Sequence, residues 1–151
     1  MEGMNANAPA PPRLAEVIDL FTSADEDMRL ELLLDFSKKL PPIPDRLIEQ
    51  RDAGMNRVPE CMTPVFLWIE GDPDAVRIHV DVAEEAPTVK GIMGVIVSTF
   101  DGATAEELQE IPLDLLHRLG LGQKIRMTRA MGVSAIINRV RRAALEKQQS
   151  G

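Results

Sequence analysis

Cys61 is the only cysteine among the 151 residues, and its surroundings favour chemistry more than those of any other side chain. Pro59 precedes the thiol, Pro64 follows it, and the apolar run 65–69 begins directly afterwards. Because proline disfavours regular structure around itself, we predict that Cys61 lies on a loop at the entrance to a strand, where a partner can reach it. A lone thiol cannot form an internal disulfide or a multi-cysteine zinc site, which leaves a nucleophile or a small buried residue.

Two charged neighbours act on this thiol in opposite directions. Glu60 disfavours the thiolate and so raises the pKa of the cysteine, whereas Arg57 offsets that effect. A single cysteine is more often a small buried hydrophobic residue than a nucleophile. The residues alone therefore do not indicate a strongly activated thiol.

Few other groups in the chain suggest catalysis. The sequence contains neither a glycine-rich phosphate loop nor a dinucleotide-binding fingerprint, and it has two histidines. His79 alternates with Arg77 and Asp81 along one strand face and is predicted to face solvent. His117 is predicted to be a surface or half-buried helix residue, and neither histidine has metal-ligand spacing. A cysteine hydrolase stays open as a third alternative, and it requires one of these histidines beside Cys61.

The chain carries a formal net charge of −7, which argues against nucleic acid or an anionic membrane surface as the main partner. The charge is uneven, because residues 1–123 hold 10 Lys and Arg against 23 Asp and Glu, whereas residues 124–151 hold 7 against 1. One interpretation is a basic last helix lying against an acidic body. The alternative is that part of this basic strip meets an acidic partner or an anionic substrate group.

The length of 151 residues and the ordinary composition predict one domain. The most apolar stretch, 92–100, is far too short to span a bilayer. The N-terminus lacks the basic start and apolar core of a signal peptide, so with a single cysteine we expect a reducing cytoplasm. We expect a disordered proline-rich tail over 1–12, a single domain over 13–147 and a short tail over 148–151.

The first third of the chain has helical patterns. Apolar residues at helical spacing predict a helix over 14–21. Ser23 and Glu26 have capping-box spacing and predict the start of a second helix. Its apolar stripe comprises Met28, Leu32, Leu33, Phe36 and Leu40. Prolines within 41–44 end that helix, and 45–57 is expected to be a long polar loop with one helical turn at its start.

A β-hairpin is predicted next. Residues 65–69 have the composition of a buried strand, 70–74 have turn composition, and 76–82 alternate between apolar and polar side chains. Residues 89–100 fit either a strand or a buried helix, and periodicity leaves both open.

The last third is predicted to be helical. Thr104 and Glu107 form another capping-box pair, and Pro112 is expected to open a helix that ends at Gly120. The last helix is predicted over about 128–146. This order of helices, hairpin and helices predicts an α+β fold, in which helices cover a small antiparallel sheet.

Four segments of the chain resemble motifs of the SufE family, in the same order and with similar spacing. Residues 58–68 resemble the family's sulfur-acceptor loop and following strand, V-x-G-C-Q-S-x-V-W-L. Leu40 and Pro41 resemble the L-P that closes the second family helix, and 85–91 is similar to the D-A-x-I-V-K-G that starts a long buried helix. Residues 128–133 resemble the S-R-x-x-G-L at the start of the last helix. The resemblance covers nearly the whole chain, from about residue 12 to about residue 147.

The resemblance implies a SufE/IscU-like α+β fold with a small antiparallel sheet of about three strands, and it implies that 89–100 is a helix. It also implies a sulfur carrier and activator rather than an enzyme. Cys61 would take sulfur as a persulfide from a cysteine desulfurase of the SufS type, stimulate that enzyme, and pass the sulfur toward an iron–sulfur assembly scaffold. Pyridoxal phosphate (PLP) would belong to the desulfurase, and this chain, as a monomer or homodimer, would hold no cofactor or metal of its own.

The resemblance also suggests residues that support the thiol loop or dock a partner. These candidates are Arg57, Glu60, Met62, Thr63, Glu85, Lys90 and Arg129. For Lys90 and Arg129 a structural role is the simpler interpretation. Lysine can reach a carboxylate, and a cation at a helix N-terminus needs a specific partner.

Several residues depart from the family pattern. Glu60 stands where the family has glycine, and Met62, Thr63 and Pro64 replace Gln-Ser-Gln, so the loop is expected to be stiffer and more negative. Glu85 replaces an aspartate. These departures motivate an alternative function, a non-catalytic binding module that docks on a desulfurase or another enzyme and regulates it without accepting sulfur. A cluster scaffold is disfavoured, because it needs several metal ligands and this chain lacks the cysteines.

Overall fold

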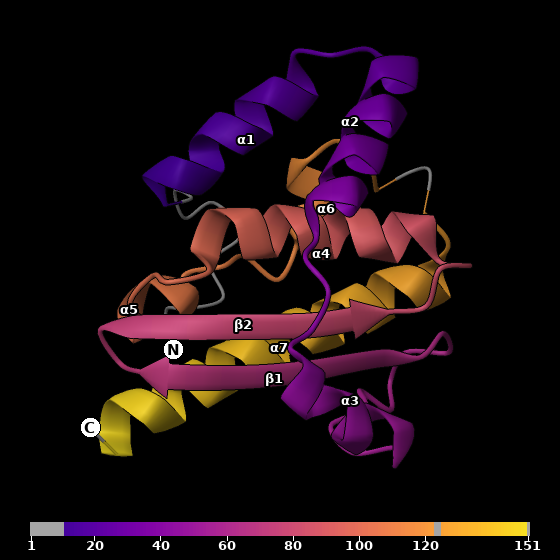
Figure 1. Cartoon of the computed structure of the whole chain (residues 1–151). Coiled ribbons are helices and arrows are strands. Elements are labelled where there is room, and N and C mark those ends of the chain that lie inside the picture. Colours follow the sequence, from indigo (N-terminus) through magenta and orange to yellow (C-terminus); the bar gives the residue numbers. More distant parts are fainter. Residues whose placement is uncertain (1–10, 123–124, 151) are drawn as a thin grey trace.

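A β-hairpin surrounded by helices forms the centre of the computed structural model, which describes residues 11–122 and 125–150 (Figure 1). Strand β1 (Val65–Asp72) pairs with strand β2 (Ala75–Val82) in an antiparallel register that places Leu67 opposite Val80. The predicted α+β fold class and the predicted hairpin are therefore confirmed.

The sheet has two strands over the described residues, where about three were expected. The segment before β1 supplies only the beginning of a third strand. Arg57 makes an isolated bridge to Phe66, and the Val58 amide donates a hydrogen bond of 2.8 Å to the Val65 carbonyl. Pro59 has no amide hydrogen to donate, so the pairing cannot continue along the ladder.

Helices account for most of the remaining described chain. They are α1 (Pro12–Thr22), α2 (Glu26–Lys39), α3 (Asp45–Asp52), α4 (Pro87–Phe100), α5 (Ala105–Leu108), α6 (Leu115–Arg118) and α7 (Met127–Ser150). Residues 89–100 lie within α4, so the helix implied by the family resemblance is confirmed. The last helix continues to Ser150 instead of ending near residue 146.

The start of α2 differs from the predicted capping box. Asp25, not Ser23, is the N-cap residue, and its carboxylate accepts a hydrogen bond of 2.9 Å from the Met28 amide. Glu26 is the first residue of the helix, which is too early for it to complete a capping box with Ser23. Met28 also lies outside the buried stripe of α2, with 47% of its surface exposed.

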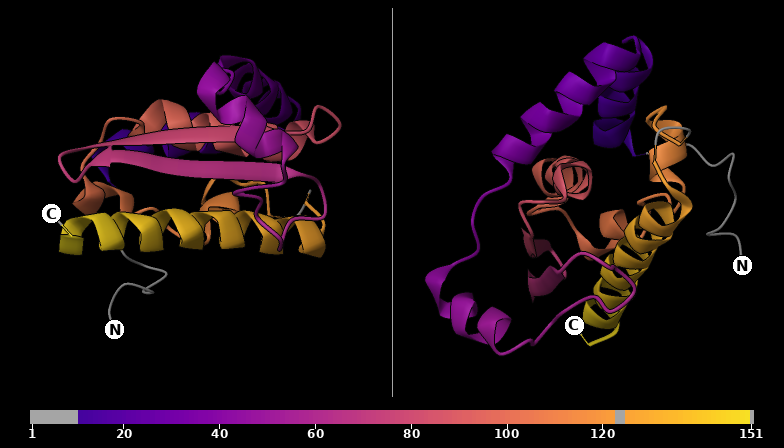
Figure 2. Two further views of the ribbon diagram at one scale, coloured as in Figure 1. Left: turned by 60° about the horizontal axis from the view of Figure 1, so that its bottom comes forward. Right: turned by 90° about the vertical axis from the view of Figure 1, so that its right-hand side faces the viewer.

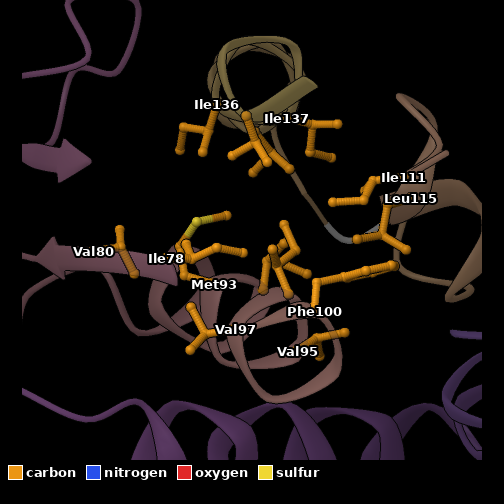
Figure 3. Packing of buried hydrophobic residues seen from close by; sticks show 14 of the residues in the cluster. Ile78, Val80, Met93, Val95, Val97, Phe100, Ile111, Leu115, Ile136 and Ile137 are labelled. Carbon is orange, nitrogen blue, oxygen red and sulfur yellow. The ribbon is translucent and has the colours of Figure 1, made fainter. Parts of the chain in front are cut away.

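The inner face of the hairpin packs against α4 and α7, which run along it in the left view of Figure 2. Every second residue of β2 is buried, as the alternating pattern predicted. Figure 3 shows Ile136 and Ile137 of α7 reaching the same core as Met93 of α4 and Ile78 of β2. This layer of apolar side chains fixes α7 relative to the hairpin.

Helix α2 packs against α4 at two glycines. A Cβ atom on Gly91 would lie 2.6 Å from the Leu33 carbonyl oxygen, and one on Gly94 would collide with the carbonyl of Phe36. Close approach of the two helices therefore requires glycine at both positions. Because α4 is covered by α2 as well as by the hairpin, it is apolar almost all round, which explains why its periodicity fits a strand equally well.

The outer face of the hairpin carries α3, where the sequence predicted mainly a polar loop over 45–57. Leu47 of α3 packs with Ile43 and Trp68 in a small second cluster. The helix is short and mostly polar, so its sequence shows little of the periodicity on which the prediction depended.

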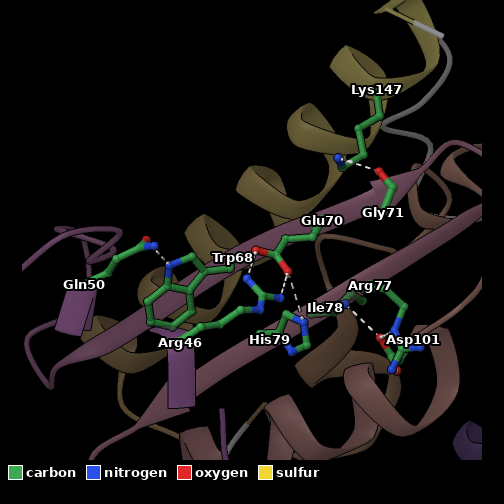
Figure 4. Close-up of polar contacts among 10 residues, drawn as sticks. All are labelled: Arg46, Gln50, Trp68, Glu70, Gly71, Arg77, Ile78, His79, Asp101 and Lys147. Carbon is green, nitrogen blue, oxygen red and sulfur yellow. Dashed lines mark hydrogen bonds and ion pairs between the residues drawn. The ribbon is translucent and has the colours of Figure 1, made fainter. Parts of the chain in front are cut away.

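Polar contacts fasten α3 to this face (Figure 4). The Trp68 indole donates a hydrogen bond of 3.0 Å to the Gln50 side chain, and Arg46 pairs with Glu70. The Nε2 atom of His79 lies 3.4 Å from the Glu70 carboxylate. His79 is therefore half-buried, with 18% of its side chain exposed, and the prediction that it faces solvent was wrong.

The short C-terminal helices follow the predicted signals in part. The capping box of Thr104 and Glu107 is present at the start of α5. Helix α6 begins at Leu115, later than the predicted start at Pro112, and Gly120 follows its end with a φ of +76°. Of the helices described, none is both long and apolar enough to cross a bilayer.

The two predicted tails have different outcomes in the structure. Residues 1–10 of the predicted N-terminal tail lie outside the described residues, and Pro12 already belongs to α1. At the other end, residues 148–150 of the predicted C-terminal tail extend α7.

Candidate functional site

Cys61 lies on the loop between α3 and β1, as predicted. The loop is closed by a hydrogen bond of 3.2 Å from the Cys61 amide to the Val58 carbonyl. The cysteine is 8% exposed, and its Sγ atom lies 3.6 Å from the carbonyl oxygen of Gly132 on α7. The thiol is on a loop that a partner can reach, but its side chain is sheltered in this conformation.

Gly132 allows α7 to come this close to the thiol. A Cβ atom at Gly132 would lie 3.1 Å from the Cys61 Sγ atom, which is tighter than ordinary van der Waals contact. A larger side chain would have to displace either the loop or the helix. The sequence showed Gly132 only as the glycine of the motif over 128–133, with no role attached.

A pocket of about 230 Å³ opens beside the thiol. Its walls are formed by Cys61, Met62, Thr63, Val65, Val89, Arg126, Thr128, Arg129 and Gly132. The pocket therefore combines the thiol loop with the starts of β1, α4 and α7, segments that are far apart in the sequence. Two guanidinium groups and the apolar side chains of Val65 and Val89 next to one thiol can accommodate a small anionic or sulfur-bearing group.

The electrostatic surroundings keep the thiol in its neutral form. Burial raises the pKa of Cys61 above its ordinary value, and the adjacent Glu60 carboxylate raises it further. Arg57 and Arg139 lower the pKa but do not cancel these effects. The predicted directions for Glu60 and Arg57 are thus present in the structure. Burial and Glu60 therefore disfavour the nucleophilic thiolate in this conformation.

Most of the predicted site residues lie around the thiol. The guanidinium of Arg57 donates to the Met62 carbonyl at 3.5 Å, and the Met62 side chain is 84% exposed. The structure brings together Arg57, Glu60, Met62, Thr63 and Arg129 on the loop or on the pocket wall.

Glu85 and Lys90 do not line the pocket. Glu85 is exposed in the turn before α4, where it makes no hydrogen bond or ion pair with any described residue. Lys90 donates a hydrogen bond of 2.6 Å to Glu84, which ties the first turn of α4 to the preceding turn. This contact supports the structural interpretation of Lys90.

Sequence reasoning missed Arg126, Thr128, Gly132 and Arg139. The first three reach the pocket only because α7 begins there. Arg139 pairs with Glu60, with 3.5 Å between Nε and Oε1. Arg139 follows Gly132 by seven residues, which places both on one face of a helix. This spacing is the feature of the sequence that could have identified Arg139.

Neither histidine belongs to this site. His79 lies on the outer face of the hairpin with Glu70, and His117 is exposed on α6. Within residues 11–122 and 125–150, no group of three or more His, Cys, Asp or Glu residues could hold a metal ion. Among the described residues, neither histidine lines the pocket beside Cys61, which disfavours a cysteine hydrolase.

Known proteins and one protein family match this chain over most of its length. Residues 15–144 match the family described as "SufE: Fe-S metabolism associated domain". An uncharacterised SufE-like protein of Mycobacterium tuberculosis is 36% identical over 144 residues, covering 95% of this chain and 99% of that protein. The sulfur acceptor protein CsdE of Escherichia coli is 30% identical over 112 residues, covering 74% of this chain and 72% of that protein.

The fold is shared with a solved structure as well. The solution structure of a hypothetical protein from Thermus thermophilus matches with a TM-score of 0.80 and 28% sequence identity, covering 93% of this chain and 99% of that chain.

Proposed function

The chain belongs to the SufE family, and on that premise we propose that Cys61 is a sulfur acceptor for a PLP-dependent cysteine desulfurase of the SufS type. The observation that carries this proposal is a single thiol on a loop, beside a pocket, in a protein without a neighbouring second cysteine. The similarity to the sulfur acceptor protein CsdE of Escherichia coli supports the same role.

The transfer chemistry needs only the thiol of this chain. The Cys61 thiolate attacks the terminal sulfur of a persulfide on the desulfurase, forming a new S–S bond. The original S–S bond breaks, and the desulfurase cysteine leaves as a thiolate. No net oxidation occurs, so this chain needs no cofactor of its own, and the PLP stays on the desulfurase. With no second cysteine, no internal thiol can attack the Cys61 persulfide and release sulfide.

Because the Cys61 side chain is 8% exposed and lies against Gly132, we expect it to move away from this contact as the donor sulfur comes within bonding distance of Sγ. The surface around the pocket offers the means for docking. Met62, Met127 and Met131 are 84%, 75% and 64% exposed, the largest exposures among the large hydrophobic residues described. Together with the exposed arginines of the pocket, they fit a partner surface that is apolar and acidic.

The proposed destination of the sulfur is an iron–sulfur assembly scaffold in a reducing cytoplasm. The family description "Fe-S metabolism associated domain" supports this destination. Among the site residues, Cys61 carries the sulfur, whereas Arg57, Glu60, Met62, Thr63 and Arg129 support the loop or dock the partner.

Intact-protein mass spectrometry tests sulfur transfer directly. The protein is incubated with a SufS-type desulfurase, PLP and cysteine without reductant. We expect a gain in mass of one sulfur atom that dithiothreitol reverses and that Cys61→Ala abolishes. Sulfur uptake by the Cys61→Ala variant would refute the assignment of Cys61.

A regulatory binding module is the second candidate function, and the burial of the thiol against Gly132 favours it. This candidate predicts that Cys61→Ala stimulates the desulfurase as fully as the wild-type protein does. Sulfur acceptance predicts that stimulation is largely lost in Cys61→Ala while binding persists. Desulfurase turnover measured with both proteins, alongside their binding affinities, separates the two functions.

A further inference from the structure

Two neighbouring residues of the thiol loop contact one face of α7. The Cys61 Sγ atom lies 3.6 Å from the Gly132 carbonyl oxygen, and a Glu60 carboxylate oxygen lies 3.5 Å from the Arg139 Nε atom. Gly132 and Arg139 are seven residues apart, which is about two helical turns, so they share a face of the helix. The loop is therefore held to α7 at two adjacent points.

The Arg139 side chain depends on this contact. Its Nε atom is buried and forms no hydrogen bond with a described residue, and the Glu60 carboxylate oxygen 3.5 Å away is the charge paired with it. Withdrawing Glu60 leaves that buried nitrogen without its counter-charge, which is unfavourable. An outward movement of the loop thus breaks both the thiol contact and the ion pair.

We propose that Glu60 and Arg139 form a latch that holds the Cys61 loop closed on α7. This role rests on Cys61 being the sulfur acceptor of the proposed function. Both residues are positioning residues, because they act through the loop and do not touch the reacting sulfur.

The latch explains why a carboxylate stands next to a thiol that must ionise. In the closed loop, burial and Glu60 raise the pKa of Cys61 against the opposing effects of Arg57 and Arg139. Arg126 and Arg129 also face the pocket from the start of α7. Opening removes the burial, which is the largest cause of the raised pKa of Cys61, so the thiol is protected when closed and more reactive when open.

The expected strength of the latch is modest. The Glu60 and Arg139 side chains are 48% and 37% exposed, and ion pairs between such groups are worth little because water screens them. We expect its loss to raise the population of the open loop about two- to fivefold. A weak latch is compatible with opening when a partner docks.

The test measures alkylation of Cys61 by iodoacetamide as a function of pH, without any desulfurase. The plateau at high pH reports the accessibility of the thiol, and the midpoint reports its pKa. We expect Glu60→Gln and Arg139→Gln each to raise the plateau about two- to fivefold. The double variant should rise no further than the larger single effect, because both substitutions remove the same pair.

The midpoint gives a second readout for Glu60→Gln. Losing the carboxylate and opening the loop both lower the pKa of Cys61, so the midpoint should move to lower pH. Exchanging the charges in Glu60→Arg with Arg139→Glu restores the pair in reverse. This double exchange should return the plateau toward the wild-type value.

Two matched control variants test whether the loss of one charge by itself changes the plateau. Glu31→Gln removes an exposed carboxylate from α2, and Arg142→Gln removes an exposed cation from α7. Neither should change the plateau. Unchanged plateaus in Glu60→Gln and Arg139→Gln, or independent effects that multiply in the double variant, would overturn the latch. Because no desulfurase is present, failure of sulfur transfer in the mass measurement is a separate result.

Discussion

At the scale of single residues, the contact between Cys61 and Gly132 decides how well the thiol is sheltered. The carbonyl of Gly132 faces the Sγ atom, and the missing side chain leaves room for the cysteine. The same glycine costs helix stability, because glycine is less favourable than alanine in a helix by about 1 kcal/mol. The glycine that shelters the thiol therefore lowers the stability of α7.

Gly132→Ala is expected to expose the thiol. The new Cβ atom would lie 3.1 Å from Sγ, so the thiol loop or α7 has to give way slightly, and we expect the loop to shift so that Cys61 is alkylated faster than in the wild-type protein. The strain and the gain in helix propensity oppose each other, each at about 1 kcal/mol, so the net stability should change little. Thiol alkylation and urea unfolding measure the two effects.

A second background isolates the contact. In Cys61→Ala the Sγ atom is absent, so adding Gly132→Ala should stabilise the protein by up to about 1 kcal/mol. If Gly132→Ala changes the free energy of unfolding equally with and without the thiol, position 132 and the Cys61 thiol are not in the contact described here.

At the scale of elements, the N-terminal ends of helices position parts of the site. The start of α7 brings Arg126, Thr128 and Arg129 to the pocket. Helix α2 begins at Asp25, whose carboxylate accepts the Met28 amide. It supports the glycine face of α4, and α4 supplies Val89 to the pocket wall. The cap of α2 therefore contributes to the site through packing.

Asp25→Ala should destabilise the protein by about 1 kcal/mol, because an N-terminal amide of α2 loses its acceptor. Ser23→Ala is the matched control, since the Ser23 side chain forms no such cap, and it should change stability by less than about 0.5 kcal/mol. Urea unfolding of both variants checks this difference. A larger loss of stability in Ser23→Ala than in Asp25→Ala would contradict the Asp25 cap and support the capping box predicted from the sequence.

At the scale of the whole molecule, cations gather at the thiol pocket of an otherwise acidic protein. The chain carries a net charge of −7, but Arg126 and Arg129 line the pocket and Arg57 lies on its loop. Other basic residues of α7 make internal contacts, such as Lys147 with the Gly71 carbonyl at 2.8 Å. These internal contacts fit the interpretation of a basic helix lying against the body of the protein, and the meeting of Arg126 and Arg129 with an acidic partner or an anionic group stays a prediction.

Removing a pocket cation should weaken docking to the desulfurase. We expect Arg126→Gln and Arg129→Gln each to reduce affinity up to about fivefold at low salt, with a smaller loss at high salt because ions screen the attraction. Arg142→Gln removes the same charge from an exposed position outside the pocket and should have a smaller effect. Calorimetric titrations at two salt concentrations compare the three variants. Equal losses in all three would show that overall charge, not the pocket, governs docking.

The elements with strong local signals were predictable from the sequence. The alternating residues of β2, the turn before it and the capping box at Thr104 depend on neighbours a few positions away. The α+β class followed from the order of these elements, and Cys61 stood out because it is the only cysteine. These properties are local or compositional, so a sequence contains them directly.

Long-range contacts were decided by the tertiary structure. Helix α4 was ambiguous from periodicity because neighbours bury it on nearly all sides, and α3 was hidden because few of its residues are apolar. The sheltering of Cys61 depends on Gly132, 71 positions later in the chain, and the Glu60–Arg139 pair depends on the same placement of α7. The sequence by itself therefore identified the one thiol that we propose as the sulfur carrier. Only the packing of α7 against the thiol loop decided how that thiol is shielded and charged, because burial and charge pairing arise between segments that meet after folding.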